Sequence, residues 1–124
     1  MKAKLIFSKG KVLARRTVGA ARLAAAIALL NETGASAIEA HIRMLTDALL
    51  SGLAELPVNI VTPTAPAHRS GIVTFSLGDV AREAALIERL LDARVMVSHR
   101  YTSGVGGIRV SCHVFNAMED VARL

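Results

Sequence analysis

The chain has 124 residues, enough for one domain with a buried core, and its 52% hydrophobic and 20% charged residues indicate a globular protein. Aromatic residues make up only 3% and tryptophan is absent, which disfavours recognition of nucleic-acid bases by stacking. The one cysteine, Cys112, can form no internal disulfide, and this favours a reducing, cytoplasmic compartment.

The net charge of +5 belongs to the start of the chain. Residues 1–16 contain four lysines, two arginines and no acid, which gives +6, whereas nine arginines and ten acids from Thr17 onward give −1. We therefore divide the chain into a basic leader, residues 1–16, and a domain, residues 17–124. The leader predicts either a small hairpin around Lys9-Gly10 or an ordered arm. The apolar stretch after it is interrupted by Arg22 and is too short to span a membrane.

Two helices are expected in the first half of the domain. Alanine and leucine predict a helix from Val18 to Asn31, and Gly34 would end it. The sequence "SAIE" at 36–39 resembles a capping box that starts a second helix. This helix ends before Pro57, with a solvated face at Glu39, Arg43, Asp47 and Glu55 and an apolar stripe at Ile38, Ile42, Leu45, Leu49 and Leu53.

The second half predicts strands and two further helices. Strands are expected at 58–63, 71–77, 95–100 and 108–115, with a loop at 62–70 and a glycine-rich connection "TSGVGG". Asp79 is expected to cap a helix, and Asn116 with Glu119 is expected to start a last one. The buried stripe of the helix after Asp79 should be Val80, Ala84, Ile87 and Leu91. The predicted fold is α+β, a small, largely antiparallel sheet with helices packed on one side.

Alternation along the last predicted strand separates a core face from a polar face. Ile108, Val110, Cys112 and Val114 would face the core, and Arg109, Ser111, His113 and Phe115 the other side. On this pattern Arg109 is either a solvated or acid-paired arginine, or a fork that binds a carboxylate or phosphate. Ser111 and His113 could add donors to such a site. Arg100 ends the preceding strand.

The segment "RYTSGVGGIRVSCHVFNAMEDV" resembles the C-terminal signature of class V aminotransferases. This pyridoxal-phosphate family of fold type I includes cysteine desulfurases, selenocysteine lyases, kynureninases and isopenicillin N epimerase-like proteins. "HRSGIVTFSL" and "GASAIEAHIRMLTDALLSGLAEL" resemble earlier parts of the family pattern. The similarity covers residues 17–124 and implies the fold of the family's small domain.

The resemblance implies a role for individual residues. Arg109 matches the arginine that binds the substrate's α-carboxylate, Arg100 matches a second contact to the substrate region, and Asn116 matches a helix cap. The loop after Arg100 has no cysteine, which disfavours a desulfurase with a nucleophilic cysteine there and favours epimerase-like or selenocysteine lyase-like relatives. Every lysine lies in the leader, so the lysine that holds pyridoxal phosphate is missing.

The sequence therefore predicts a substrate-carboxylate-binding small domain that is inactive alone. The expected partners are an amino acid substrate, the missing large domain that carries pyridoxal phosphate, and a second copy in a homodimer. The alternative is a stand-alone binding module whose basic leader contacts nucleic acid or an acidic partner.

The remaining histidines and Cys112 show no metal-ligand spacing. His41 is expected to be a satisfied histidine at a helix interface, and Arg69 a solvated arginine. His68 lies in the predicted loop, and His99 lies beside Arg100. No metal site is predicted.

Overall fold

A computed structural model of the chain describes residues 2–124, with side chains from Val18 onward. It divides into two compact units, residues 1–38 and 39–124. The element order is α1, α2, β1, a short 3-10 helix, β2, α3, β3, β4 and α4. No helix among the described residues is both long enough and apolar enough to cross a membrane.

The first helix, α1, runs from Lys2 to Thr33, so the hairpin expected around Lys9-Gly10 is wrong. The leader and the predicted helix are one continuous element, because the leader consists largely of residues with good helix propensity. The helix ends as expected at Gly34, which has a left-handed φ of 86° and whose amide donates to the Leu30 carbonyl at 3.0 Å.

The second helix, α2, runs from Ala35 to Ala54. It begins one residue before Ser36, so Ser36 lies inside the first turn and the expected capping box is wrong. Glu39 pairs instead with Arg43, at 2.8 Å, on the exposed face. The apolar stripe is confirmed at Leu45, Leu49 and Leu53, which are buried.

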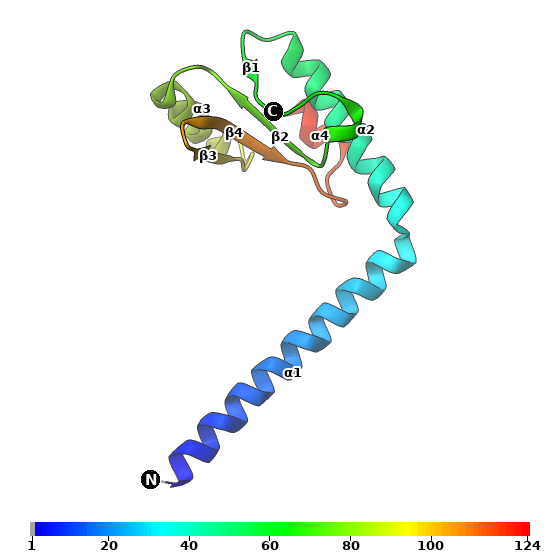
Figure 1. Ribbon diagram of the computed structural model, residues 1–124, viewed down its shortest axis with the longest axis vertical. Helices are drawn as coiled ribbons and strands as arrows, with labels where there is room; N and C mark the ends of the chain where they lie inside the picture. The colour runs from blue at the N-terminus through cyan, green and yellow to red at the C-terminus, as the bar shows by residue number, and fades with distance from the viewer. Residues whose placement is uncertain (1) are drawn as a thin grey trace. The chain divides into compact units, whose positions relative to one another are not determined.

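Four strands form one antiparallel sheet in the order β1-β2-β4-β3 (Figure 1). Their bounds are Asn59–Ile60 for β1, Ile72–Ser76 for β2, Ser98–Thr102 for β3 and Val105–Ser111 for β4. The 3-10 helix Pro66–His68 lies in the predicted loop. The last predicted strand is shorter than expected, because β4 ends at Ser111 and leaves His113 and Phe115 beyond it.

Strands β3 and β4 are joined by a tight turn rather than by the long glycine-rich loop. Ser103 and Gly104 both have a left-handed φ, 50° and 79°, which is the backbone pattern of a two-residue hairpin turn. The next two glycines belong to β4. A Cβ at Gly106 would meet the carbonyl oxygen of Arg100, and one at Gly107 would meet that of Phe75. The glycines therefore allow close approach of the strands.

The third helix, α3, spans Val80–Asp92, and Asp79 caps it as expected by accepting from the amides of Ala81 and Arg82 at 2.8 and 3.1 Å. Of its predicted buried stripe, Ile87 is confirmed because it packs against the core, whereas Ala84 is exposed and Val80 and Leu91 are 57% and 58% exposed. The buried residues are Glu83 and Leu90. The inward face also carries Leu86 and Ile87, which pack against the core, and the Glu83 carboxylate finds hydrogen-bond donors there.

The last helix, α4, spans Met118–Ala122, and its N-cap is Ala117 rather than Asn116. The carboxylate that accepts from the cap amide belongs to Asp120 rather than Glu119, at 3.0 Å. This backbone bond holds the pKa of Asp120 below its usual value. Asn116 instead closes the preceding turn, since its Oδ1 accepts from the His113 amide at 2.8 Å.

The α+β fold is as predicted, with helices on one face of the sheet. Leu49, Leu50 and Leu53 of α2 form the core with residues of β2 and β4, and side chains of α3 and α4 pack against the same cluster. The strand residues in this core are Val73, Phe75 and Ile108. Alternation places Thr74 and Arg109 on the opposite face, where the candidate site lies.

Candidate functional site

The polar face of the sheet is centred on Arg109 in β4. Its direct neighbours in the register are Thr74 of β2 and Ser98 of β3. Residues directly opposite one another in an antiparallel sheet share a face, so two hydroxyl-bearing residues flank the arginine. All three are partly buried. The sheet therefore places a cation between two groups that can donate or accept hydrogen bonds.

The guanidinium of Arg109 is incompletely satisfied. Its Nε is buried and has no hydrogen-bond partner among the described residues. The ion pairs found among residues 18–124 join Glu39 with Arg43, Asp47 with Arg69, and Glu83 with His99, so none contains Arg109 or Arg100. A partly buried cation without an acid beside it favours an anion as its partner. No acid pairs with Arg109 among the described residues, and the fork that binds a carboxylate or phosphate stays a prediction.

Arg100 and Ser111 lie on the same face as Arg109. Arg100 is opposite Gly107, two positions from Arg109 along β4, and it is exposed. Because Gly107 has no side chain, nothing from that position covers the space beside Arg100. Ser111 is two positions beyond Arg109 in the other direction and is exposed. The structure therefore brings these three predicted residues together along one strand pair.

His113 is not brought to this face by β4. The strand ends at Ser111, and the ring of His113 stacks on Phe115 with centroids 4.6 Å apart. Cys112, expected on the core side, packs at the edge of the core cluster. Burial raises the pKa of its thiol, which disfavours the reactive thiolate.

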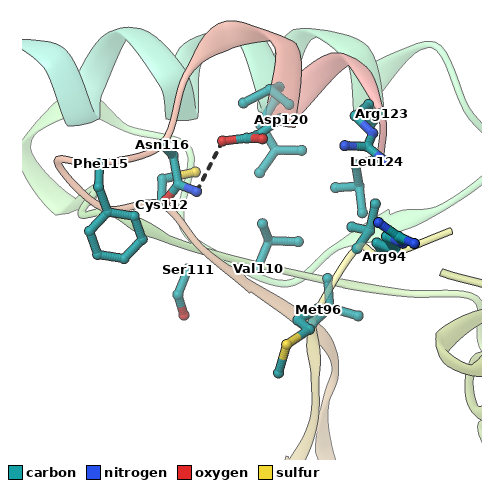
Figure 2. A pocket seen from close by; sticks show the side chains of 14 residues that line it. Arg94, Met96, Val110, Ser111, Cys112, Phe115, Asn116, Asp120, Arg123 and Leu124 are labelled. Carbon is teal, nitrogen blue, oxygen red and sulfur yellow. Dashed lines mark hydrogen bonds between the residues drawn. The ribbon is translucent and has the colours of Figure 1, made fainter. Parts of the chain in front are cut away.

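A pocket of about 350 Å³ lies on the core side, beside the end of β4. Ser111 lines it, but Arg109 and Arg100 do not. Figure 2 shows Phe115 on one side of the pocket and both Arg94 and Arg123 on the other, with Leu124 between them. The pocket and the predicted arginine site therefore share Ser111, and the two arginines lie outside the pocket lining.

Glu83, a residue that the sequence did not single out, is fully buried. Its Oε1 accepts from the Ser76 hydroxyl at 2.7 Å and from the Leu77 amide at 2.9 Å. Its Oε2 lies 2.8 Å from His99 Nε2 and accepts from the Tyr101 hydroxyl, also at 2.8 Å. Burial disfavours the charged form, but these hydrogen bonds outweigh it and lower the pKa of Glu83 to about 2.

Two of the remaining candidates have structural partners. Nε2 of His41 lies 2.8 Å from the Asn116 carbonyl oxygen, so the expected satisfied interface histidine is confirmed. Arg69, expected to be solvated, forms an ion pair with Asp47. His68 is exposed. No cluster of metal-ligand side chains occurs among the described residues.

Residues 14–124 match the family Aminotransferase class-V, and the chain belongs to this family. It is 29% identical over 127 residues to the "Probable cysteine desulfurase 2" of Mycobacterium leprae (strain TN), covering 95% of this chain and 30% of that protein. The apo structure of a cysteine desulfurase from Thermococcus onnurineus NA1 matches with a TM-score of 0.73 and 27% identity. That match covers 81% of this chain and 27% of the other.

A complex of the cystine C-S lyase C-DES with its reaction product cysteine persulfide shares the fold, with a TM-score of 0.54 and 23% identity. It covers 66% of this chain and 21% of that one. The chain thus spans less than a third of the length of each of these relatives.

Enzymes of this family depend on pyridoxal phosphate, but the described side chains do not fit its attachment. The cofactor needs a lysine, and residues 12–124 contain none. The four lysines of the chain all precede Val12, where side chains lie outside the described residues. For the same reason, contact of the basic leader with nucleic acid or an acidic partner stays a prediction.

Thr74, Ser98 and Glu83 are not among the residues expected from the sequence. Thr74 and Ser98 join the site only through the register of β2, β4 and β3, which no single segment reveals. A signal for Glu83 did exist, because its spacing from Leu86 and Leu90 fits one helical face. A carboxylate on an apolar stripe calls for donors, and the nearby serine, histidine and tyrosine could have been considered as its partners.

Proposed function

We propose that this chain is the substrate-carboxylate-binding small domain of a pyridoxal-phosphate-dependent enzyme that acts on an amino acid. The observation that carries the proposal is the guanidinium of Arg109, whose Nε is buried without a partner among the described residues and which has no acid beside it. A carboxylate bound in parallel by two N–H groups would satisfy this charge.

The other residues of the polar face have supporting roles in this proposal. Arg100 makes a second contact to the anion, and Ser111 donates from its hydroxyl. Thr74 and Ser98 orient the ligand from the flanking strands. A role for His113 would need its ring to leave Phe115 and stays a prediction.

The proposal includes a large domain that supplies the pyridoxal phosphate and its lysine. The length of the relatives and the lack of lysine after Lys11 support it. The active site then forms between the two domains within a homodimer, with Arg109 at the substrate end.

In this proposal the reaction does not use a nucleophilic cysteine from the β3–β4 hairpin. The matched relatives from Mycobacterium leprae and Thermococcus onnurineus NA1 are named cysteine desulfurases. Here the hairpin carries serine and glycine at its turn, and Cys112 has a raised pKa and packs at the core edge. Selenocysteine lyase-like or epimerase-like chemistry therefore suits these residues better.

Titration of the full chain with L-alanine, followed by NMR of the arginine side chains, tests the carboxylate site. We expect L-alanine to shift the Nε–H resonance of Arg109, and Arg109→Gln to weaken binding by about tenfold or more. Arg89→Gln, an exposed arginine on α3, is the matched control and should bind like wild type. L-alaninamide, which lacks the carboxylate, should not bind. Equal shifts with the amide, or unchanged binding by Arg109→Gln, would contradict the proposal.

A further inference from the structure

The four hydrogen bonds of Glu83 join three elements. The residue lies on α3, Ser76 ends β2, Leu77 follows it, and His99 and Tyr101 belong to β3. All four partner distances lie between 2.7 and 2.9 Å. Through these hydrogen bonds the fully buried carboxylate of Glu83 holds β2 and β3 in place relative to α3.

The two partners on β3 stand on either side of Arg100. Because alternate side chains of a strand face opposite ways, His99 and Tyr101 point to the helix-covered face and Arg100 points to the polar face. Their rings also contact each other edge to face, with centroids 5.4 Å apart. Holding both neighbours fixes the direction in which Arg100 leaves the strand.

Strand β3 depends on the hydrogen bonds to Glu83 because it is an edge strand of the sheet. Among the described residues it pairs with β4 alone, through the hairpin turn at Ser103 and Gly104. A strand at the edge of a sheet is held by hydrogen bonds on one side only, and it shifts more easily than a central strand. The bonds from α3 therefore add a second attachment.

We propose that Glu83 is a positioning residue for the anion site: by holding His99 and Tyr101 it directs Arg100 toward the face that carries Arg109. The inference rests on the proposed function for the role of Arg100 in binding. The control of β3 by Glu83 is independent of any ligand. Glu83 does not touch the substrate, since it lies on the other side of the sheet.

Site-resolved amide hydrogen exchange of the full chain tests the ligand-independent part. In Glu83→Gln the side-chain amide cannot accept all four bonds, and we expect exchange in β3 to rise about tenfold or more. The amides of α2 and of the centre of β2 should stay as in wild type. A uniform rise in all elements would mean a general loss of stability and would overturn the inference.

A second variant covers the case in which Glu83→Gln does not fold. Tyr101→Phe removes one donor to Glu83 and keeps the ring. It should raise exchange in β3 alone and by a smaller factor. Glu88→Gln, an exposed glutamate on the same helix, is the matched control and should leave β3 unchanged.

A double-mutant cycle with L-alanine tests the action through Arg100. We expect Glu83→Gln to weaken binding about as much as Arg100→Gln does, and the double variant to bind no more weakly than Arg100→Gln alone. If Glu83→Gln weakens L-alanine binding by the same factor in wild type and in Arg100→Gln, the positioning role is overturned. If wild type does not bind L-alanine, the proposed function fails, and the exchange pattern still decides whether Glu83 controls β3.

Discussion

Arg109 and Glu83 are two charged residues that differ in how well their charged groups are hydrogen-bonded within the chain. The Glu83 carboxylate is fully buried and meets four donors from β2, β3 and the turn after β2. The Arg109 guanidinium is partly buried, and its Nε has no partner among the described residues. Burying a charge is costly unless it is paired, so Glu83 is satisfied by the chain itself, whereas Arg109 is available for the proposed anion.

The lowered pKa of Glu83 predicts a dependence of stability on pH. Its folded-state value of about 2 lies below the ordinary 4.5, so the stabilisation is fully present above pH 4.5 and is lost as the pH falls toward 2. We expect the free energy of unfolding of wild type to drop across this window. In Glu83→Gln this part of the drop should be missing.

Urea denaturation at pH 2.5, 4 and 6 measures this difference. The gap in unfolding free energy between wild type and Glu83→Gln should be largest at pH 6 and should narrow toward pH 2.5. A gap that stays constant with pH would show that Glu83 has the same pKa in the folded and unfolded states, which would contradict this prediction.

At the scale of elements, the β3–β4 hairpin decides which side chains share the candidate site. The left-handed pair Ser103 and Gly104 sets the register, and this register places Ser98 opposite Arg109 and Gly107 opposite Arg100. A shift of the register by one residue would put Arg109 on the core face. Gly106 and Gly107, which follow the turn, let β4 approach β3 and β2 closely. The local sequence of β4 therefore contributes to the geometry of the site.

Gly107→Ala is expected to destabilise the chain by about 1–3 kcal/mol. The added Cβ would meet the carbonyl oxygen of Phe75, and the residue's φ of 151° is one that side chains rarely adopt. Gly52→Ala is the opposite control, because that site on α2 has open space and alanine favours a helix by roughly 0.5–1 kcal/mol. Urea denaturation of both variants measures the two effects. Equal stability of Gly107→Ala and wild type would contradict the close approach.

At the scale of the whole molecule, large apolar side chains remain exposed in each unit. Leu23 and Leu29 of α1 are 62% and 64% exposed, and Met96 and Phe115 in the second unit are 87% and 79% exposed. Exposed apolar surface of this kind usually marks a region that another surface covers. It agrees with the proposal that a large domain completes the protein.

The chain alone is therefore expected to self-associate or to bind a hydrophobic dye. Replacing both Leu23 and Leu29 by glutamine should reduce self-association, because it removes apolar area from α1. Arg22→Gln, which changes an exposed polar residue of the same helix, should not reduce it. Sedimentation velocity at several concentrations measures the effect. A wild-type chain that stays monomeric and binds no dye would count against the proposal of a missing domain.

The sequence by itself determined the α+β class, the order of the elements and the polar character of the Arg109 side of β4. These features depend on local patterns, such as the stripe at Leu45, Leu49 and Leu53 or the cap at Asp79, which each segment carries alone. The family signature likewise lies in one continuous segment, from Arg100 to Val121.

Only the tertiary structure decided which residues meet. Thr74 and Ser98 flank Arg109 because three strands pair in one register, and separate segments do not encode that pairing. The burial of Glu83 and the rotation of α3 away from Val80 and Leu91 depend on donors from β2 and β3. Glu83 lies on the same helical face as Leu86, Ile87 and Leu90, and its burial there depends on hydrogen bonds to distant segments, since a buried carboxylate must be satisfied.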